Sequence, residues 1–328
     1  MENALIEFRN LKTHFHTSNG TVKAVNDVSF KIREGETLCV VGESGCGKSV
    51  TAMTMMRLID SPHTSDGQIW FEGKDLLKLN KGQMQQIRGN DISIIFQEPM
   101  SSLNPVLTIG EQITEPLLMH TLMSKKEAHA RAIELINLVG ISRSEEIFHS
   151  YPHELSGGMR QRIMIAIALS CNPKLLIADE PTTALDVTIQ AQILDLMRDL
   201  KDKLKTSIML ITHDLGVVAE MADYVVVMYA GNVIEEAPVI ELFKNPQHPY
   251  TQGLLKAKPV INQKMDRLYS IPGQVPNPIE LGENCHFHDR CSHCMQICKD
   301  QVPPLNEKEN GHKVACWLYE KEGGGQRI

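Results

Sequence analysis

The stretch that decides the fold is Gly42-Glu43-Ser44-Gly45-Cys46-Gly47-Lys48-Ser49, which directly follows the apolar run Thr37–Val41. A glycine-rich turn between a strand and a helix is the pattern of a phosphate-binding loop. The glycines let the backbone wrap closely around phosphates, with amide N–H groups pointing inward at a helix N-terminus. We expect Lys48 to contact the β- and γ-phosphates and the Ser49 hydroxyl to coordinate magnesium. The alternative, a turn that binds nothing, is disfavoured by the strand before it and the helix after it.

A second stretch, Leu175-Leu176-Ile177-Ala178-Asp179-Glu180, reads as an apolar strand that ends in two carboxylates. Such a strand delivers its last residues to the carboxyl edge of a parallel sheet, where ligands collect. We expect Asp179 to hold magnesium, directly or through water, and Glu180 to act as general base on the attacking water. Many strands end in solvated acids, so this pattern indicates a catalytic site only in combination with the phosphate loop.

A third stretch, Leu155-Ser156-Gly157-Gly158-Met159-Arg160-Gln161, predicts another anion-binding turn, at the start of a helix over Met159–Leu169. One nucleotide does not need two such turns from one chain. The economical explanation is that this turn completes a nucleotide site on a second, facing subunit. The alternative is an ordinary helix cap with Ser156 at the N-cap, which leaves both glycines unexplained.

The remaining pattern predicts an α/β domain with a mainly parallel sheet. Residues Leu5–Ile32 alternate apolar and polar positions around the turn Asn19-Gly20, so they predict two strands. Apolar residues at helical spacing over Ile109–Ser150 and Ile189–Leu200 predict helices. Short apolar runs predict strands at Thr37–Val41, Gln68–Phe71, Ile92–Phe96, Leu175–Ala178 and Ile208–Ile211.

Composition narrows the class of protein. The chain has 328 residues, 42% of them hydrophobic, and a net charge of -7, so no large basic surface for nucleic acid is expected. The N-terminus has no basic segment followed by an apolar stretch, so no secretory signal is predicted. Apolar runs such as Ile163–Leu169 and Tyr224–Ala230 are far shorter than the roughly 18 residues of a membrane span. We therefore expect a soluble protein, for which any membrane role would have to come through partners.

The composition changes near Asn245, after which the chain is rich in proline and cysteine. We therefore predict a core domain over residues 1–245 and a small irregular domain over 246–328. Without a secretory signal, clustered cysteines indicate metal binding more than disulfides. Five of the eight cysteines lie in this tail: Cys285, Cys291, Cys294, Cys298 and Cys316.

Taken together, these stretches resemble the nucleotide-binding subunit of an ATP-binding cassette (ABC) transporter. The three stretches occur in the family's order, and the resemblance spans roughly residues 5–245. Further family motifs are Ile95-Phe96-Gln97-Glu98-Pro99, Ala184-Leu185-Asp186 and Ile211-Thr212-His213-Asp214. The resemblance implies a P-loop NTPase cassette with a mainly parallel core sheet, an antiparallel β subdomain, a helical subdomain at about 98–160, and a small irregular Cys-rich C-terminal domain.

The resemblance also implies roles for single residues. Gln97 would sense magnesium and the attacking water, His213 would contact the γ-phosphate and orient Glu180, and Asp186 would lie at a dimer interface. Phe15 falls where the family stacks an aromatic ring on adenine, although a Phe in an alternating strand is also a core residue. The implied nucleotide-site residues are Phe15, Gly42, Ser44, Gly45, Cys46, Gly47, Lys48, Ser49, Val50, Ser156, Gly157, Gly158, Asp179 and Asp186, with Ser49, Gln97 and Asp179 at magnesium and Glu180, His213 and Gln97 in catalysis.

The tail is similar to that of the peptide-importer branch, which includes di- and oligopeptide and nickel systems. The similar segments are Asn245–Thr251, Ile271-Pro272-Gly273 and the terminal cysteines. In that branch the cysteines matching Cys285, Cys291, Cys298 and Cys316 ligate a 4Fe-4S cluster. Cys294 is an extra thiol, so a compact trio Cys291, Cys294 and Cys298 stays open. Zinc also stays open, with His286, His288 and His293 nearby.

The expected function is that of an ATP-binding and ATP-hydrolysing subunit that energises import of di- or oligopeptides. Its expected partners are a second ABC ATPase subunit, as a heterodimer, two transmembrane permease subunits and, indirectly, an extracytoplasmic peptide-binding protein. Its expected cofactors are ATP, Mg²⁺ and the 4Fe-4S cluster, and its expected place is the cytoplasmic face of the cell membrane. The alternatives are a nickel or other solute importer of the same branch, a soluble ABC ATPase of translation or DNA repair, and a structural metal protein that retains the cassette.

Overall fold

The computed structural model describes residues 4–97, 102–183, 185–257 and 269–320. The chain divides into two compact units. The first, which we call the helical unit, comprises Met1–Leu5, Ile32–Thr37 and Lys78–Ile211. The second comprises Ile6–Lys31, Leu38–Leu77 and Thr212–Ile328, and we call it the loop unit because it contains the phosphate loop.

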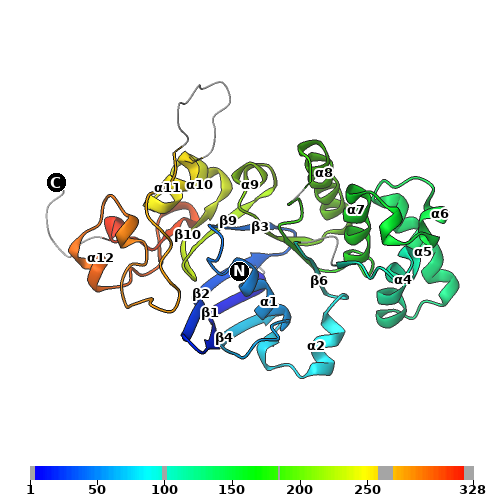
Figure 1. The fold of residues 1–328 in the computed structure, drawn as a ribbon, viewed down its shortest axis with the longest axis horizontal. Helices are drawn as coiled ribbons and strands as arrows, with labels where there is room; N and C mark the ends of the chain where they lie inside the picture. Colours follow the sequence, from blue (N-terminus) through cyan, green and yellow to red (C-terminus); the bar gives the residue numbers. More distant parts are fainter. Residues whose placement is uncertain (1–3, 98–101, 184, 258–268, 321–328) are drawn as a thin grey trace. The chain divides into compact units, whose positions relative to one another are not determined.

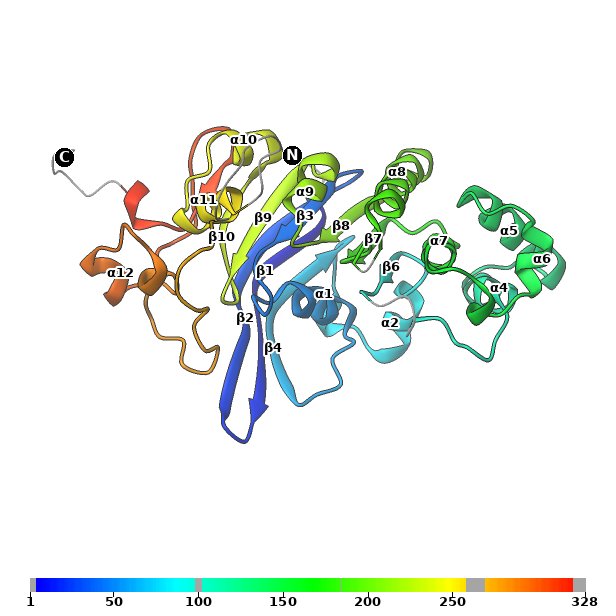
Figure 2. The same ribbon diagram turned by 45° about the horizontal axis from the view of Figure 1, so that its top comes forward.

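The helical unit contains three parallel strands, which Figure 2 labels, and the helices around them (Figure 1). The strands are β6 (Ile92–Ile95), β7 (Leu175–Asp179) and β8 (Ser207–Ile211). The helices are α2 (Lys81–Ile87), α4 (Ile109–His120), α5 (Lys125–Leu138), α6 (Ser144–His149), α7 (Gly157–Ala168) and α8 (Val187–Leu204), with a 3-10 turn at Pro152–Glu154. Strand β7 pairs in parallel with both neighbours, placing Asp179 opposite Ile211. Every residue of β7 and β8 is buried, as parallel strands covered on both faces require.

The predicted helical stretch 109–150 forms three helices because local capping signals interrupt it. Capping boxes start two of them, Thr108 with Glu111 at α4 and Ser124 with Glu127 at α5. The glutamate carboxylates and N-cap hydroxyls satisfy backbone N–H groups that the first helical turn leaves without partners. Helix α7 contacts α4 and α5 on the one hand and β6 and α8 on the other, so it joins the helical group to the strands.

The loop unit contains the remaining strands and helices. Its strands are β1 (Ala4–Thr17), β2 (Gly20–Arg33), β3 (Thr37–Val41), β4 (His63–Phe71), β5 (Lys74–Asp75), β9 (Tyr224–Tyr229), β10 (Asn232–Pro238), β11 (Asn306–Glu307) and β12 (Lys313–Val314). Its helices are α1 (Lys48–Met56), α9 (Leu215–Met221), α10 (Val239–Lys244), α11 (Pro249–Lys256) and α12 (Gln296–Asp300), with 3-10 turns at Leu76–Lys78, His288–Arg290, Glu309–Gly311 and Trp317–Tyr319.

Two sets of strands organise the loop unit. One is an antiparallel sheet in the order β2-β1-β4-β5, in which the long strands β1, β2 and β4 lie side by side (Figure 2). In the other, β3 pairs in parallel with β9, and β9 pairs antiparallel with β10. The rings of Phe8 on β1 and Phe30 on β2 stack with centroids 4.3 Å apart in the core of the antiparallel sheet. The predicted α/β class, with parallel strands, an antiparallel sheet and a helical group, is confirmed.

The tail is built onto strand β10. Strand β12 pairs antiparallel with β10, with Val314 opposite Glu235, and β11 pairs with β12. Buried His312 contacts buried Glu235 with 2.7 Å between the ring nitrogen and the carboxylate. The tail therefore shares a sheet with β9 and β10, and the separate Cys-rich domain predicted from the sequence is not confirmed.

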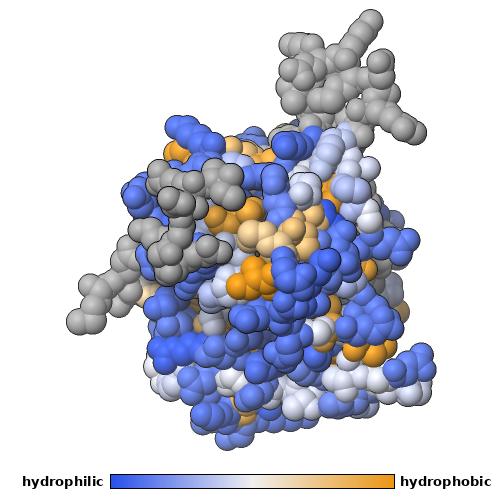
Figure 3. Space-filling model, turned by 90° about the vertical axis from the view of Figure 1, so that its left-hand side faces the viewer, coloured by the Kyte–Doolittle hydropathy of each residue, from blue (hydrophilic) through white to orange (hydrophobic). Residues whose placement is uncertain are grey.

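The described residues contain no helix that is both long and apolar enough to cross a lipid bilayer. The face shown in Figure 3 is largely hydrophilic, with small hydrophobic areas between charged and polar residues. Exposed apolar side chains of the tail include Met295, Ile297, Val302 and Leu318. Scattered apolar side chains of this kind are ordinary on protein surfaces.

Candidate nucleotide-binding site

The phosphate loop lies between β3 and α1, as predicted. Gly42 has φ 150° and Gly47 has φ 102°, and a Cβ on either would come within 2.4 Å of a backbone oxygen. Glycine is therefore required at both positions. The N-cap of α1 is Gly47, which has no side chain to accept a hydrogen bond from the first turn. Amide N–H groups at such a helix N-terminus are suited to bind a phosphate.

Lys48 is buried, and its ammonium group lies against the loop itself. Its Nζ donates to the carbonyl oxygens of Gly42 at 2.8 Å and Glu43 at 3.1 Å. The Cys46 side chain is also buried, and burial raises the pKa of its thiol. Ser49 and Val50, the next residues of α1, are half-buried. The loop thus concentrates one positive charge and a row of amides, which is a chemistry that fits a polyphosphate.

Two residues outside the predicted site hold the loop from the tail side. The Glu43 N–H donates to the Tyr250 hydroxyl at 2.8 Å, and Arg290 donates to both Glu43 carboxylate oxygens, at 2.7 and 3.0 Å. Sequence reasoning did not assign either residue to the site. The available signals were weak, since Tyr250 lies within the Asn245–Thr251 motif and Arg290 directly precedes Cys291.

The carboxylates Asp179 and Glu180 lie in the helical unit, at the end of β7. Asp179 is buried, and Glu180 has a left-handed backbone with φ 48°. The Glu180 carboxylate accepts hydrogen bonds from Gln97 Nε2 and from Thr183 Oγ1, both at 2.9 Å. The structure therefore brings Gln97 to Glu180, and two donors fix the direction of the carboxylate. Such a group can orient a water molecule and accept its proton.

The turn Ser156-Gly157-Gly158 starts α7. Ser156 is exposed and is the N-cap, with its hydroxyl accepting a hydrogen bond from the Met159 N–H at 3.3 Å. A Cβ on Gly158 would lie 3.1 Å from Ile189 Cγ2, so close packing against α8 explains this glycine in part. Gln161 Nε2 donates to the Pro181 carbonyl at 2.6 Å, which ties α7 to the segment that follows Glu180.

The other predicted site residues have these surroundings. Asp186 is exposed and caps α8, accepting from the Thr188 and Ile189 N–H groups at 3.0 Å. His213 is exposed and lies in the loop unit just before α9. Phe15 is half-buried on β1, with its ring 6.2 Å from that of His63. Ala184, part of the motif that contains Asp186, lies outside the described residues.

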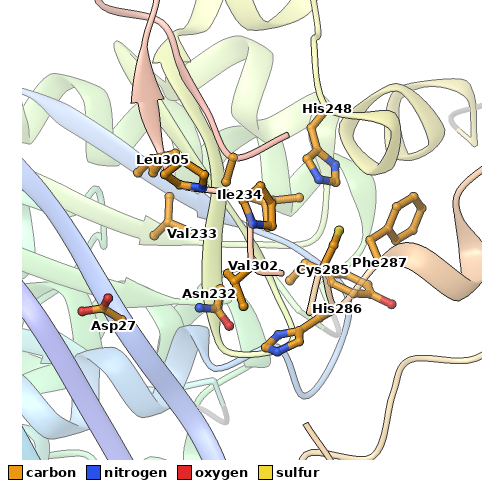
Figure 4. Close-up of a pocket in the computed structure, with 14 residues that line it drawn as sticks. Asp27, Asn232, Val233, Ile234, His248, Cys285, His286, Phe287, Val302 and Leu305 are labelled. Carbon is orange, nitrogen blue, oxygen red and sulfur yellow. The ribbon is translucent and has the colours of Figure 1, made fainter. Parts of the chain in front are cut away.

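Of the five tail cysteines, Cys285 lines a cavity. A cavity of about 220 Å³ is lined by Val233 and Ile234 of β10 and by Cys285, His286 and Phe287 of the tail (Figure 4). Burial raises the pKa of Cys285 to about 12 and that of Cys316 to about 11. The five tail cysteines are free thiols.

These thiols do not fit a zinc site. A tetrahedral Zn²⁺ with thiolates brings sulfur atoms to about 3.8 Å from one another. In the described part of the chain, three potential ligand atoms come within 4.8 Å of one another only at His129, Glu145 and His149, on α5 and α6. The zinc alternative for Cys285, Cys291, Cys298 and Cys316 therefore has no support, and neither has the compact cysteine trio.

Comparisons with known proteins agree with the three motifs. Residues 25–183 match the family described as ABC transporter, and residues 234–298 match the family described as oligopeptide/dipeptide transporter, C-terminal region. The chain is 57% identical to the oligopeptide transport ATP-binding protein AppD of Bacillus subtilis, covering 98% of this chain and 99% of that protein. It is 49% identical to the dipeptide transport ATP-binding protein DppD of Lactococcus lactis, covering 97% of this chain and 92% of that protein.

The fold also matches solved cassettes. The dimeric structure of a post-hydrolysis state of the ATP-binding cassette MJ0796, bound to ADP and Pi, has a TM-score of 0.64 and 27% identity, covering 71% of this chain and 98% of that chain. A protein of Clostridium perfringens, cbiO1 of the cbiONQ transporter complex, has a TM-score of 0.63 and 26% identity, covering 74% of this chain and 92% of that chain.

The same comparisons contradict the predicted 4Fe-4S cluster. The matching tail family is described only by its transporter class, and the relatives are described as transport ATP-binding proteins. The prediction took the cluster from the resemblance of the tail to the peptide-importer branch, and its ligands from the cysteines that match. In the structure these residues instead contribute to packing: Cys298 and Cys316 are buried, and Cys285 lines the cavity. The prediction of an iron–sulfur cluster is therefore wrong.

Proposed function

Because this chain belongs to the ABC transporter ATP-binding family, we propose that it is the ATP-hydrolysing subunit that energises import of di- or oligopeptides through a membrane permease. The assignment of peptides as the transported substrate rests on the match of residues 234–298 to the oligopeptide/dipeptide transporter C-terminal region. Nickel import and a non-transport ABC ATPase, the alternatives left open by the sequence, gain no support from the relatives' names.

The phosphate loop would bind the ATP phosphates. Its amides and Lys48 supply positive potential, Ser49 and Asp179 are the residues that would hold magnesium, and Gln97 would sense it. Magnesium, when bound with ATP, neutralises charge on the phosphate oxygens. The β3–loop–α1 geometry and the buried ammonium of Lys48 support this assignment.

Glu180 would act as general base. Its carboxylate takes the proton of a water that attacks the γ-phosphate, and the products are ADP and inorganic phosphate. Gln97 and Thr183 hold the carboxylate by hydrogen bonds of 2.9 Å, so its direction is set before the reaction. His213 would contact the γ-phosphate and Phe15 would stack on adenine, as the family resemblance implies.

The turn at Ser156 would complete a nucleotide site on a second cassette. Ser156 is exposed, the turn starts a helix, and the sequence contains one phosphate loop. In this arrangement each ATP lies between Lys48 and Ser49 of one subunit and Ser156 and Gly158 of the other. Asp186 would lie at the interface, and the second cassette would be a different chain, giving a heterodimer.

The complex would include two permease subunits and, indirectly, an extracytoplasmic peptide-binding protein, with this chain on the cytoplasmic face of the membrane. The permeases would dock on residues 98–115, of which residues 98–101 lie outside the described residues. Val106 within it is apolar and 75% exposed, as a docking residue would be before assembly. The division into a cassette over 1–245, with its helical subdomain at about 98–160, and an extension over 246–328 belongs to the same proposal.

Transport by the reconstituted complex tests the function. The chain would be assembled with its permeases and second cassette in proteoliposomes, with the peptide-binding protein and a labelled tripeptide added. We expect ATP-dependent uptake in wild type and none with Lys48→Ala, while the membrane-bound assembly stays intact. Uptake of Ni²⁺ without uptake of peptide, or ATP hydrolysis that no permease stimulates, would contradict the proposal.

A further inference from the structure

The phosphate loop is clamped at Glu43 by the tail. Arg290 donates from both terminal nitrogens to the two carboxylate oxygens, at 2.7 and 3.0 Å. This two-point pairing is the geometry in which an arginine binds a carboxylate best. On the backbone side, the Glu43 N–H donates to Tyr250, and the Glu43 carbonyl accepts from Lys48. All these residues belong to the loop unit.

Arg290 is itself fixed in the tail. Its side chain is 4% exposed, against 29% for Glu43. Its Nε donates to the Pro272 carbonyl at 3.0 Å, and its guanidinium lies 5.7 Å from the ring centroid of Tyr229 and 5.8 Å from that of Phe287. Hydrogen bonding to Glu43 raises the pKa of Arg290, so its charge is permanent. A buried, fully charged arginine held in this way has little freedom to leave its partner.

We propose that Arg290 is a positioning residue for nucleotide binding, which holds the phosphate loop in its binding shape and cancels the Glu43 charge. The inference rests on the proposed function of the loop as an ATP site. It goes beyond that function because it makes the tail a part of the nucleotide site.

Two physical effects support the assignment. A bare carboxylate one residue after Gly42 would repel an incoming polyphosphate, since charges a few ångströms apart interact strongly near a protein surface. In addition, Lys48 donates to the Glu43 carbonyl, so the position of residue 43 also sets where the ammonium lies. Removing Arg290 alone leaves the partly buried Glu43 carboxylate without its partner. An unpaired buried charge of this kind costs more free energy than removal of the whole ion pair.

The test is a double-mutant cycle on the affinity for ATP. Full-length chains carrying Arg290→Met, Glu43→Gln or both would be titrated with a fluorescent ATP analogue. We expect Arg290→Met to raise the Kd about tenfold and Glu43→Gln to change it less than about twofold. The double variant should recover to within about threefold of wild type, because contacting charged residues couple in such a cycle.

A purely structural role for Arg290 gives a different result. In that case Arg290→Met lowers the melting temperature but leaves the ATP affinity of the folded protein unchanged, or it lowers the ATP affinity in a way that Glu43→Gln does not restore. The matched control is Lys308→Met, which removes a tail cation that pairs with Glu320 instead of the loop, at 3.5 Å. It should leave the Kd unchanged.

Arg290→Lys provides a second route in case Arg290→Met does not fold. It keeps the charge and loses the two-point geometry, so we expect a Kd about threefold above wild type. An unchanged Kd in Arg290→Lys and in any folded Arg290→Met, or a loss of affinity that Glu43→Gln does not relieve, would overturn the inference. Failure of the wild-type chain to bind ATP in a Lys48-dependent way would instead overturn the proposed function.

Discussion

Helices α1 and α7 both start at glycine-containing turns, but their N-termini are built differently. Helix α1 starts at Gly47 in a left-handed conformation, and in the described residues no side chain caps it. Helix α7 starts at Ser156 in an extended conformation, and the Ser156 hydroxyl caps the first turn. At α1, the backbone N–H groups of the first turn are therefore available to bind an anion that the loop surrounds. At α7, the first turn is already capped, and Ser156 presents an exposed hydroxyl. This arrangement suits a ligand that is held mainly by another subunit.

The two turns also differ in what supports them. Tyr250 and Arg290 hold the phosphate loop from the tail. The turn at Ser156 is supported within its own unit, where Arg160 donates to the Leu155 carbonyl at 2.6 Å and Gln161 to the Pro181 carbonyl. A change in the tail should therefore affect the phosphate loop and leave the turn at Ser156 as it is.

The largest effect is expected from Glu180→Gln. Loss of a general base typically lowers turnover about 10²- to 10⁴-fold, and the amide should leave ATP binding intact. The ATPase rate and ATP affinity of the assembled complex measure the two quantities separately. Glu134→Gln, at a residue on α5 whose partner is Arg131, is the control and should have a normal rate. Normal turnover in Glu180→Gln would remove this residue from its role.

Lys48→Ala should act on binding. Loss of a charged hydrogen-bond donor costs about 1.5–3 kcal/mol, or roughly 10- to 100-fold in the Kd of ATP. Equilibrium titration of the full-length chain measures it. The control is Lys31→Ala, at an exposed lysine that pairs with Glu7 at 3.0 Å. If both variants bound ATP as well as wild type does, the loop would not be the nucleotide site.

The free energy of unfolding should depend on pH through His248, which contacts Tyr250, one of the two tail residues that hold the phosphate loop. Its Nδ1 accepts from the Tyr250 N–H at 3.0 Å, and burial lowers its pKa to about 4. A histidine with a lowered folded-state pKa is favoured in its neutral form, so stability falls as pH drops from about 6.5 towards 4. At pH 5 the loss is about 2 kcal/mol relative to pH 8.

Urea unfolding at pH 5 and pH 8 measures this loss, with His248→Asn as the comparison. Asparagine can keep the cap on α11 and does not titrate. The free energy of unfolding of His248→Asn should therefore depend less on pH by about 2 kcal/mol. An identical pH dependence in the two proteins would show that His248 is not the titrating group.

The smallest effect is expected from Tyr250→Phe. It removes the acceptor for the Glu43 N–H and should cost about 1 kcal/mol, or about fivefold in the Kd of ATP. Tyr319→Phe is the matched control, because its hydroxyl donates to the Gln247 carbonyl at 2.9 Å and does not touch the loop. Equal effects of the two variants on ATP affinity would contradict a specific role for Tyr250.

The phosphate loop was predictable because its signals are local. The strand, the glycines and the start of α1 lie within about twenty consecutive residues and follow from backbone geometry alone. Strand β4 was predicted only from Gln68, whereas it starts at His63. Its first residues are polar, and they join the sheet by pairing with β1, where His63 lies opposite Phe15. Because these first residues are polar, the sequence shows no alternation of apolar and polar residues from which this part of the strand could be predicted.

The tail was predicted poorly for a related reason. Arg290 and Glu43 are 247 positions apart, and no periodicity links them. The cysteines suggested a metal centre because thiols are its usual ligands, but Cys298 is buried, Cys285 lines the cavity and Cys316 follows a strand paired to β10. The roles of the individual site residues, including Phe15 and His213, stay predictions.

The central claim is that the turn at Ser156 serves the nucleotide of the facing cassette, and one labelling experiment tests it most directly. The complex with two distinct ATPase chains would carry Ser156→Arg in this chain and be photolabelled with azido-ATP. Ser124→Arg, which also removes a serine N-cap, would be the control. We predict that label is lost from the phosphate loop of the other chain and kept on this one. Loss of label from this chain's own loop, with the other chain labelled normally, would contradict the account.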